Sequence, residues 1–255
     1  MKKNRVLRWI LLLGSLHCQI ALCAEPAVTL YNMPSALRLQ LKVETEQRRR
    51  GECEQKKLAL ESTAFYALQN KNLLIFIGLP DYFCGSASFM PVTIDSQGHW
   101  SAGAVIESNP SLLLTDAARR LWLVSHFEIE AVFPLLHQSQ DGVHWQEITL
   151  PKPADIACCF QYLKNVCVTE SVLQLKLTGL EDTTVSYWQT PLRTNLPPNP
   201  AWQKMSLPPI KKASQCQTVP LTSGDWQRKL SKNSLAIEFH SAAQRMTVIM
   251  PRWLD

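Results

Sequence analysis

Cysteines are the side chains of this chain whose number and spacing point most directly to chemistry. Two of the eight lie near the N-terminus, and the other six are Cys53, Cys84, Cys158, Cys159, Cys167 and Cys216. An even number of thiols in an exported protein indicates disulfide bonds, because an oxidising compartment joins neighbouring thiols. Cys158 and Cys159 would point to opposite faces of a strand and take different partners. We predict that one pairs with Cys167 and the other with Cys216, and that Cys53 pairs with Cys84, as one of fifteen possible sets.

Metal binding and nucleophilic catalysis are the alternative uses of such side chains, and the sequence favours neither. It contains no C-x-x-C pair, and the histidines near the cysteines do not lie at ligand spacing. No serine lies in a G-x-S-x-G turn. His126 and His240 lie in strand-like segments, where a core or surface role is more common than a catalytic one. We therefore expect no cofactor, no metal and no catalytic residue of these types.

The N-terminus has the features of a cleavable secretory signal. Its four basic residues are Lys2, Lys3, Arg5 and Arg8. A short apolar stretch follows at 10–16, and small residues end the segment. We predict cleavage after Ala24, with Cys23 as an alternative site and a lipid anchor on Cys23 as the rival interpretation. The stretch is too short to span a bilayer, so we expect a periplasmic or secreted protein without a transmembrane segment.

Charge gives no indication of a nucleic-acid or anionic membrane partner. Removing the first 24 of the 255 residues leaves 22 basic and 21 acidic side chains. The basicity of the whole chain therefore belongs mostly to the export segment. The whole sequence is 46% hydrophobic, which is enough to bury a core. Residues 25–255 are long enough to form one all-β domain, which we predict.

Short apolar runs separated by turn-forming residues fill most of the chain. Alternating apolar and polar residues over 36–46 predict a half-buried strand. The runs TAFYAL and LLIFIGLP flank the polar QNKN at 69–72, which is typical of a hairpin. Only the stretch 109–123 has helical character, and its end fits a strand as well. The pattern predicts an all-β fold.

One motif occurs twice. SQDGVHWQEITLP at 139–151 and NPAWQKMSLPP at 199–209 align on Trp145 and Trp202, and a Pro-Leu pair precedes both tryptophans at the same distance. A weaker copy ends at Trp100, so the tryptophans recur about every 50 residues, near the period of propeller blades. A four-stranded unit cannot bury both faces alone, so copies pack face to face around an axis. We expect a closed β-propeller-like disc with each indole wedged between neighbouring sheets, and a β-sandwich as the runner-up.

The motif resembles the Asp-box, or BNR repeat, of sialidase-like β-propellers. In that family a Ser/Thr-x-Asp-x-Gly-x-Thr-Trp turn joins the two outer strands of a blade. One copy here, with one residue missing between Asp and Gly, is Ser139, Asp141, Gly142 and Trp145. The other, with its glycine one place late, is Thr93, Asp95, Gly98 and Trp100. The copy at Trp202 has neither Asp nor Gly.

The role of such a turn is structural. The Asp141 carboxylate can accept N–H groups of its own loop while Gly142 takes a positive φ. In the family these turns lie at the periphery of the blade, away from the catalytic centre. The resemblance and the chain length together imply four or five blades.

A sialidase also needs an arginine cluster, a tyrosine nucleophile with a glutamate partner and a further acidic residue. Candidates are Arg119, Arg120, Arg193, Arg228, Arg245, Tyr66, Tyr162, Tyr187, Glu128 and Glu130. The early Arg-Ile-Pro signature of the family is absent, and the mature chain is too short for six blades. The sequence therefore favours an exported, non-catalytic binding or scaffold protein of the cell envelope. Its partner would be a protein or a glycan, and loops 80–89 and 194–200 are possible recognition edges. The alternative is a sialidase-like glycoside hydrolase of reduced size.

Overall fold

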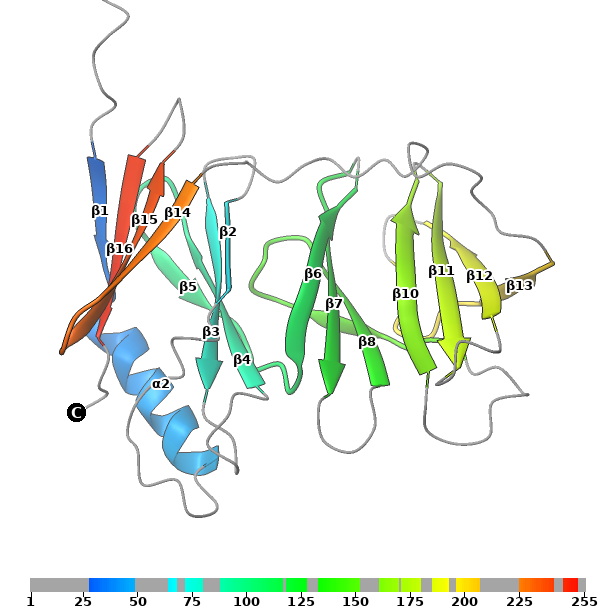
Figure 1. Cartoon of the computed structure of the whole chain (residues 1–255), viewed down its shortest axis with the longest axis horizontal. Coiled ribbons are helices and arrows are strands. Elements are labelled where there is room, and N and C mark those ends of the chain that lie inside the picture. The colour runs from blue at the N-terminus through cyan, green and yellow to red at the C-terminus, as the bar shows by residue number, and fades with distance from the viewer. Residues whose placement is uncertain are drawn as a thin grey trace, which may run out of the picture.

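The computed structural model describes residues 28–48, 64–67, 72–79, 88–116, 118–127, 133–151, 161–169, 171–179, 185–192, 196–206, 225–240 and 245–251. These residues form four four-stranded sheets and one helix (Figure 1). The predicted all-β, propeller-like fold is confirmed, with four sheets in the described part of the chain.

Three of the sheets are antiparallel meanders of consecutive strands. Sheet I consists of β2 (Ala64–Ala67), β3 (Leu73–Leu79), β4 (Ser88–Ile94) and β5 (Trp100–Ala102). Sheet II consists of β6 (Asn109–Thr115), β7 (Leu121–Phe127), β8 (Phe133–Ser139) and β9 (Gln146–Ile148). Sheet III consists of β10 (Gln161–Val168), β11 (Val172–Gly179), β12 (Val185–Pro191) and β13 (Gln203–Met205). The stretch 109–123 thus lies in the β6–β7 hairpin and not in a helix.

Sheet IV joins two segments that lie far apart in the sequence. It consists of β14 (Asp225–Leu230), β15 (Ser234–His240) and β16 (Arg245–Pro251), and β1 (Val28–Asn32) pairs with β16 in parallel. The first strand therefore completes the last sheet.

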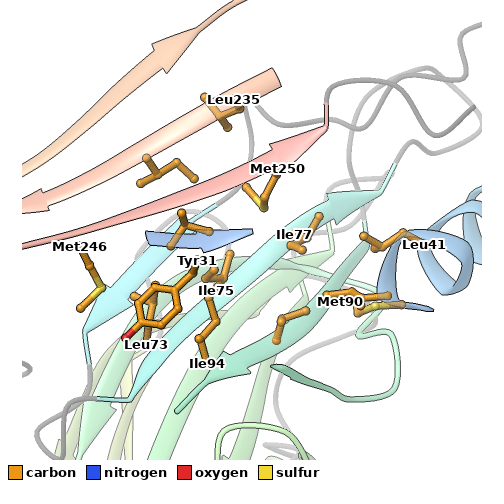
Figure 2. Close-up of a cluster of buried hydrophobic side chains, with 14 of the residues drawn as sticks. Tyr31, Leu41, Leu73, Ile75, Ile77, Met90, Ile94, Leu235, Met246 and Met250 are labelled. Atoms are coloured by element: carbon orange, nitrogen blue, oxygen red, sulfur yellow. The ribbon is translucent and has the colours of Figure 1, made fainter. Parts of the chain in front are cut away.

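Hydrophobic clusters connect the sheets in the order IV, I, II, III, which Figure 1 shows from left to right. Between sheets IV and I, side chains of β3 and β4 pack against those of β15 and β16. Figure 2 shows this cluster, with Tyr31 and Leu41 contributed by β1 and the helix. The second cluster lies between sheets I and II, and the third between sheets II and III.

The expected closed disc is wrong for the described residues, whose clusters do not connect sheet III to sheet IV. The burial pattern gives the physical reason. All seven residues of β3 are buried, because sheet I has a neighbour on each face. In β15 and β16 only alternate residues are buried, because the described sheets cover sheet IV on one face. The sheets form an open fan.

The strand expected over 36–46 is also wrong, because these residues belong to helix α2 (Ser35–Arg48). Leu37, Leu41 and Thr45 are four residues apart, so a helix places them on one face, and all three are buried. Leu39 and Val43 are exposed. The polar residues between them are arginine, glutamine, lysine and glutamate, which favour a helix. The sequence thus fits both the two-residue period of a strand and the 3.6-residue period of a helix. Packing against β3 selects the helix.

Candidate binding site

The turn between β8 and β9 is organised by the carboxylate of Asp141. Its Oδ1 accepts the backbone N–H groups of Val143 and His144, both at 2.8 Å. Gly142 has a φ of 80°, a conformation that glycine adopts without steric cost. Ser139 adds two bonds, since its Oγ accepts the N–H of Gly142 and donates to Asp141. The turn residues named from the sequence are therefore brought together here.

Electrostatics stabilise the charged form of Asp141. Burial raises the pKa of this carboxyl, but hydrogen bonds from His144, Val143 and Ser139 outweigh burial and lower the pKa to about 2. The imidazole Nδ1 of His144 lies 2.7 Å from Oδ2. The carboxylate is thus engaged by its own loop.

The same turn fixes an indole ring at an interface between sheets. Trp145 Nε1 donates to the carbonyl of Gly142 at 2.9 Å. The ring packs against Phe76 of sheet I at a centroid distance of 5.7 Å. Trp145 therefore lies between sheets I and II, as expected from the repeat.

The turn between β4 and β5 is built in the same way. Asp95 Oδ1 accepts the N–H groups of Gln97 and His99, at 2.8 and 2.9 Å. The backbone N–H of His99 is the main cause that lowers the pKa of Asp95. Gly98 has a φ of 88°, and Thr93 is a buried residue of β4. Trp100 packs against the cluster between sheets IV and I.

The third copy uses a neighbouring sheet in place of an internal carboxylate. Trp202 Nε1 donates to the carbonyl of Thr149 at 2.8 Å, and the Thr149 N–H donates to the carbonyl of Pro198 at 2.7 Å. Gln138 Nε2 donates to the carbonyl of Leu196 at 2.7 Å. Trp202 packs between sheets II and III. All three repeat tryptophans thus occupy equivalent interfaces.

A buried ion pair in the β6–β7 turn was not found by sequence reasoning. Asp116 accepts the Nε–H of Arg120 at 2.6 Å and the Nε1–H of Trp122 at 3.2 Å. The side chains of Asp116 and Arg120 are 2% and 10% exposed. The available indication was an acidic and a basic residue four positions apart between two apolar runs. Such spacing suits a tight turn, which the positive φ of Arg119 completes.

His137 is a second residue that the sequence did not single out. It lies on β8 and is 7% exposed, and its Nδ1 has no hydrogen-bond partner among the described residues. Burial lowers its pKa to about 4, so the imidazole is neutral at neutral pH.

A pocket of about 350 Å³ opens beside these turns on sheet II. Its lining residues are Arg120, Gln138, Ser139, Gln140, Asp141, His144, Trp145 and Gln146. Asp116 compensates the charge of Arg120, and His144 contacts Asp141. The polar lining is therefore dominated by amides, and one half-buried indole adds an apolar surface.

Of the sialidase-type candidates that lie in the described part of the chain, Arg120 alone lines this pocket. Arg228 and Arg245 belong to sheet IV, Tyr66 to sheet I, and Tyr162 and Tyr187 to sheet III. Arg193, Glu128 and Glu130 lie outside the described residues, as does most of the loop 80–89.

Cys167 on β10 is disulfide-bonded. The other five cysteines of the predicted pairings lie outside the described residues, so these pairings stay a prediction. Groups of three or more possible metal ligands do not occur among the described residues. Helix α2 is too short and too polar to cross a membrane, and it is the one helix that the described residues contain.

No protein-family model and no curated protein matches the sequence. Among solved structures, the chain is similar to Zg3597, a family 117 glycoside hydrolase of the marine bacterium Zobellia galactanivorans. The identity is 10% and the TM-score 0.33, over 78% of this chain and 74% of the hydrolase. It is also similar to the polysaccharide lyase Uly1, with 14% identity and a TM-score of 0.26, over 76% of this chain and 58% of the lyase. Similarity at this level assigns no activity.

Proposed function

We propose that the chain is a non-catalytic binding protein whose pocket on sheet II accepts a neutral sugar unit of a glycan. The lining of the pocket is the observation that carries this proposal. Three glutamines, Gln138, Gln140 and Gln146, line the pocket, and an amide carries both donors and acceptors, as sugar hydroxyls require. Both N–H groups of Gln138 already donate within the protein, to Leu196 and Gln146, so Gln138 offers its Oε1 and Gln146 offers its Nε2. The indole of Trp145 offers an apolar surface, and about 350 Å³ lies in the usual range of ligand pockets.

Charge favours a neutral ligand over an acidic one. The guanidinium of Arg120 is 2.6 Å from the Asp116 carboxylate, so little positive charge remains for a ligand carboxylate. The Asp141 carboxylate accepts bonds within its own turn, so it is poorly placed as a general acid or base. This arrangement supports binding without turnover.

Titration calorimetry with a panel of neutral and acidic oligosaccharides tests the proposal. We expect a neutral member to bind and Gln146→Ala to weaken its binding about tenfold, as expected for the loss of one hydrogen bond. Gln203→Ala is the matched control. Gln203 follows Trp202 as Gln146 follows Trp145, and it bonds Gln189 at 3.2 Å as Gln146 bonds Gln138 at 3.1 Å. An equal loss in both variants, or release of reducing sugar from the ligand, would contradict the proposal.

We further propose that the protein is exported. The N-terminal segment supports this, and so does the disulfide bond at Cys167, because disulfides persist in oxidising compartments. The intact mass after periplasmic expression is expected to correspond to a start at Glu25. A lipid-modified Cys23 would identify the anchored alternative, and a retained N-terminus would contradict export.

A further inference from the structure

Strand β1 is an edge of sheet IV, and one hydrogen bond shows how its backbone is oriented. The N–H of Met33, the residue after β1, donates to the carbonyl of Ile249 on β16 at 3.1 Å. In a parallel pair, every second residue directs both its N–H and its C=O toward the neighbouring strand. Two-residue steps back from Met33 reach Tyr31 and Thr29. These residues therefore face β16.

The other three residues of β1 direct their backbone groups away from the sheet. They are Val28, Leu30 and Asn32, and β16 is the one strand that pairs with β1 among those described. Val28 and Leu30 are also 60% and 56% exposed. Among the described strands, the edge thus combines backbone groups without a strand partner with an apolar surface.

Sequence features that normally protect an edge are missing from β1. Its five residues, VTLYN, include no charge and no proline. By comparison, the outermost strands β5, β9 and β13 have three residues each. Helix α2, which follows β1, packs toward β3 and does not cover this edge (Figure 1). An extended polypeptide is the partner that such an edge fits.

We propose that β1 pairs in antiparallel orientation with β1 of a second copy of the chain, about a two-fold axis through Leu30. The outward-facing residues, 28, 30 and 32, are symmetric about this position. Leu30 then lies opposite Leu30 of the other copy, and Val28 lies opposite Asn32. Each opposed pair exchanges both backbone bonds, and no like charges meet. The two copies of sheet IV become one eight-stranded sheet.

Sedimentation equilibrium of the full chain with its disulfides intact tests the pairing. Wild type is expected to form a dimer. Leu30→Pro should raise the dissociation constant of the dimer about tenfold or more, because each of the two copies loses the N–H donor of residue 30. The N–H of Leu30 does not face β16, so proline leaves the ladder within sheet IV intact. The thermal unfolding midpoint of the monomer should therefore change little.

A second pair of variants separates the edge from general surface hydrophobicity. Leu30→Lys should also weaken the dimer, since a charge protects an edge. Leu39→Lys should not, although Leu39 on α2 is 62% exposed. A wild-type monomer at every concentration would overturn the proposal. So would a dimer of unchanged affinity in both Leu30 variants, or a monomer that binds only an isolated β1 peptide.

Discussion

Sheet I and sheet IV contain strands of the same length but bury them differently. In β3 of sheet I, neighbouring residues alternate between two hydrophobic clusters, so Ile75 faces sheet IV and Phe76 faces sheet II. In β16 of sheet IV, Val248 is buried but Thr247 is only partly covered. A continuous apolar run therefore indicates a sheet with two neighbours, and an alternating run indicates a sheet at the end of the fan.

Truncation of adjacent side chains in each sheet should give the largest changes in the free energy of unfolding. Ile75→Ala and Phe76→Ala should each reduce the free energy of unfolding by about 3 to 5 kcal/mol, because both side chains are fully buried. In β16, Val248→Ala should cost about 2 kcal/mol and Thr247→Ala less than about 0.5 kcal/mol. Chemical denaturation measures all four values. Equal costs at 247 and 248 would show that sheet IV is covered on both faces.

Gly103 tests how closely sheets I and II approach. A Cβ at this position would lie 2.0 Å from the backbone oxygen of Val143, so Gly103→Ala forces the two backbones apart. We expect a loss of about 3 kcal/mol in unfolding free energy. Gly98→Ala, where a Cβ would meet only the ring of Tyr31 at 3.3 Å, should cost about 1 kcal/mol through its positive φ. The reverse order would contradict the close approach.

Acid should weaken the protein through His137 of sheet II. The folded chain has a pKa of about 4 at this imidazole, against 6.5 in the unfolded chain. The unfolded state therefore binds the proton first as the pH falls below 6.5, and stability decreases until about pH 4. The full loss approaches about 3 kcal/mol. The unfolding free energy, measured at several pH values in this range, should depend less steeply on pH in His137→Leu than in wild type. An unchanged pH dependence in that variant would exclude His137 as the cause.

The smallest effect is expected at the exposed turn of Asp141. Its carboxyl has a lowered pKa, so its stabilising contribution is complete above pH 3.8 and is lost as the pH falls through about 2. Asp141→Asn should cost about 1 kcal/mol at neutral pH, allowing for solvent screening. The difference from wild type should disappear in strong acid. Glu147→Gln, on the adjacent strand β9, is the control and should leave stability unchanged at neutral pH.

The sequence predicted features that depend on local chemistry. The aspartates, the glycines at 98 and 142 and the repeated tryptophans follow from turn geometry and from the spacing of the repeat. The buried ion pair of Asp116 and Arg120 depends on a hairpin whose sequence fits a helix and a strand alike, so its role was missed. The alternation over 37–45 was compatible with both a strand and a helix, and only the contacts of α2 decide between them.

The open fan could have been inferred from the same runs of residues. VLQLKLTG, SLAIEFH and RMTVIMP alternate, whereas LLIFIGL does not. The closed disc was inferred from the repeat alone. A repeat shows that similar units follow one another, but it does not show whether the last unit packs against the first. The pocket was not predictable, since it combines side chains of two separate turns.

The pairing of β1 with β16 constrains the order in which the protein can fold. β1 is synthesised long before its partner β16, because about 210 residues separate the two strands in the sequence. The cluster between sheets IV and I therefore stays incomplete until β16 has been made. Contacts between such distant residues slow folding, and a chain without β16 would lack the strand that pairs with β1.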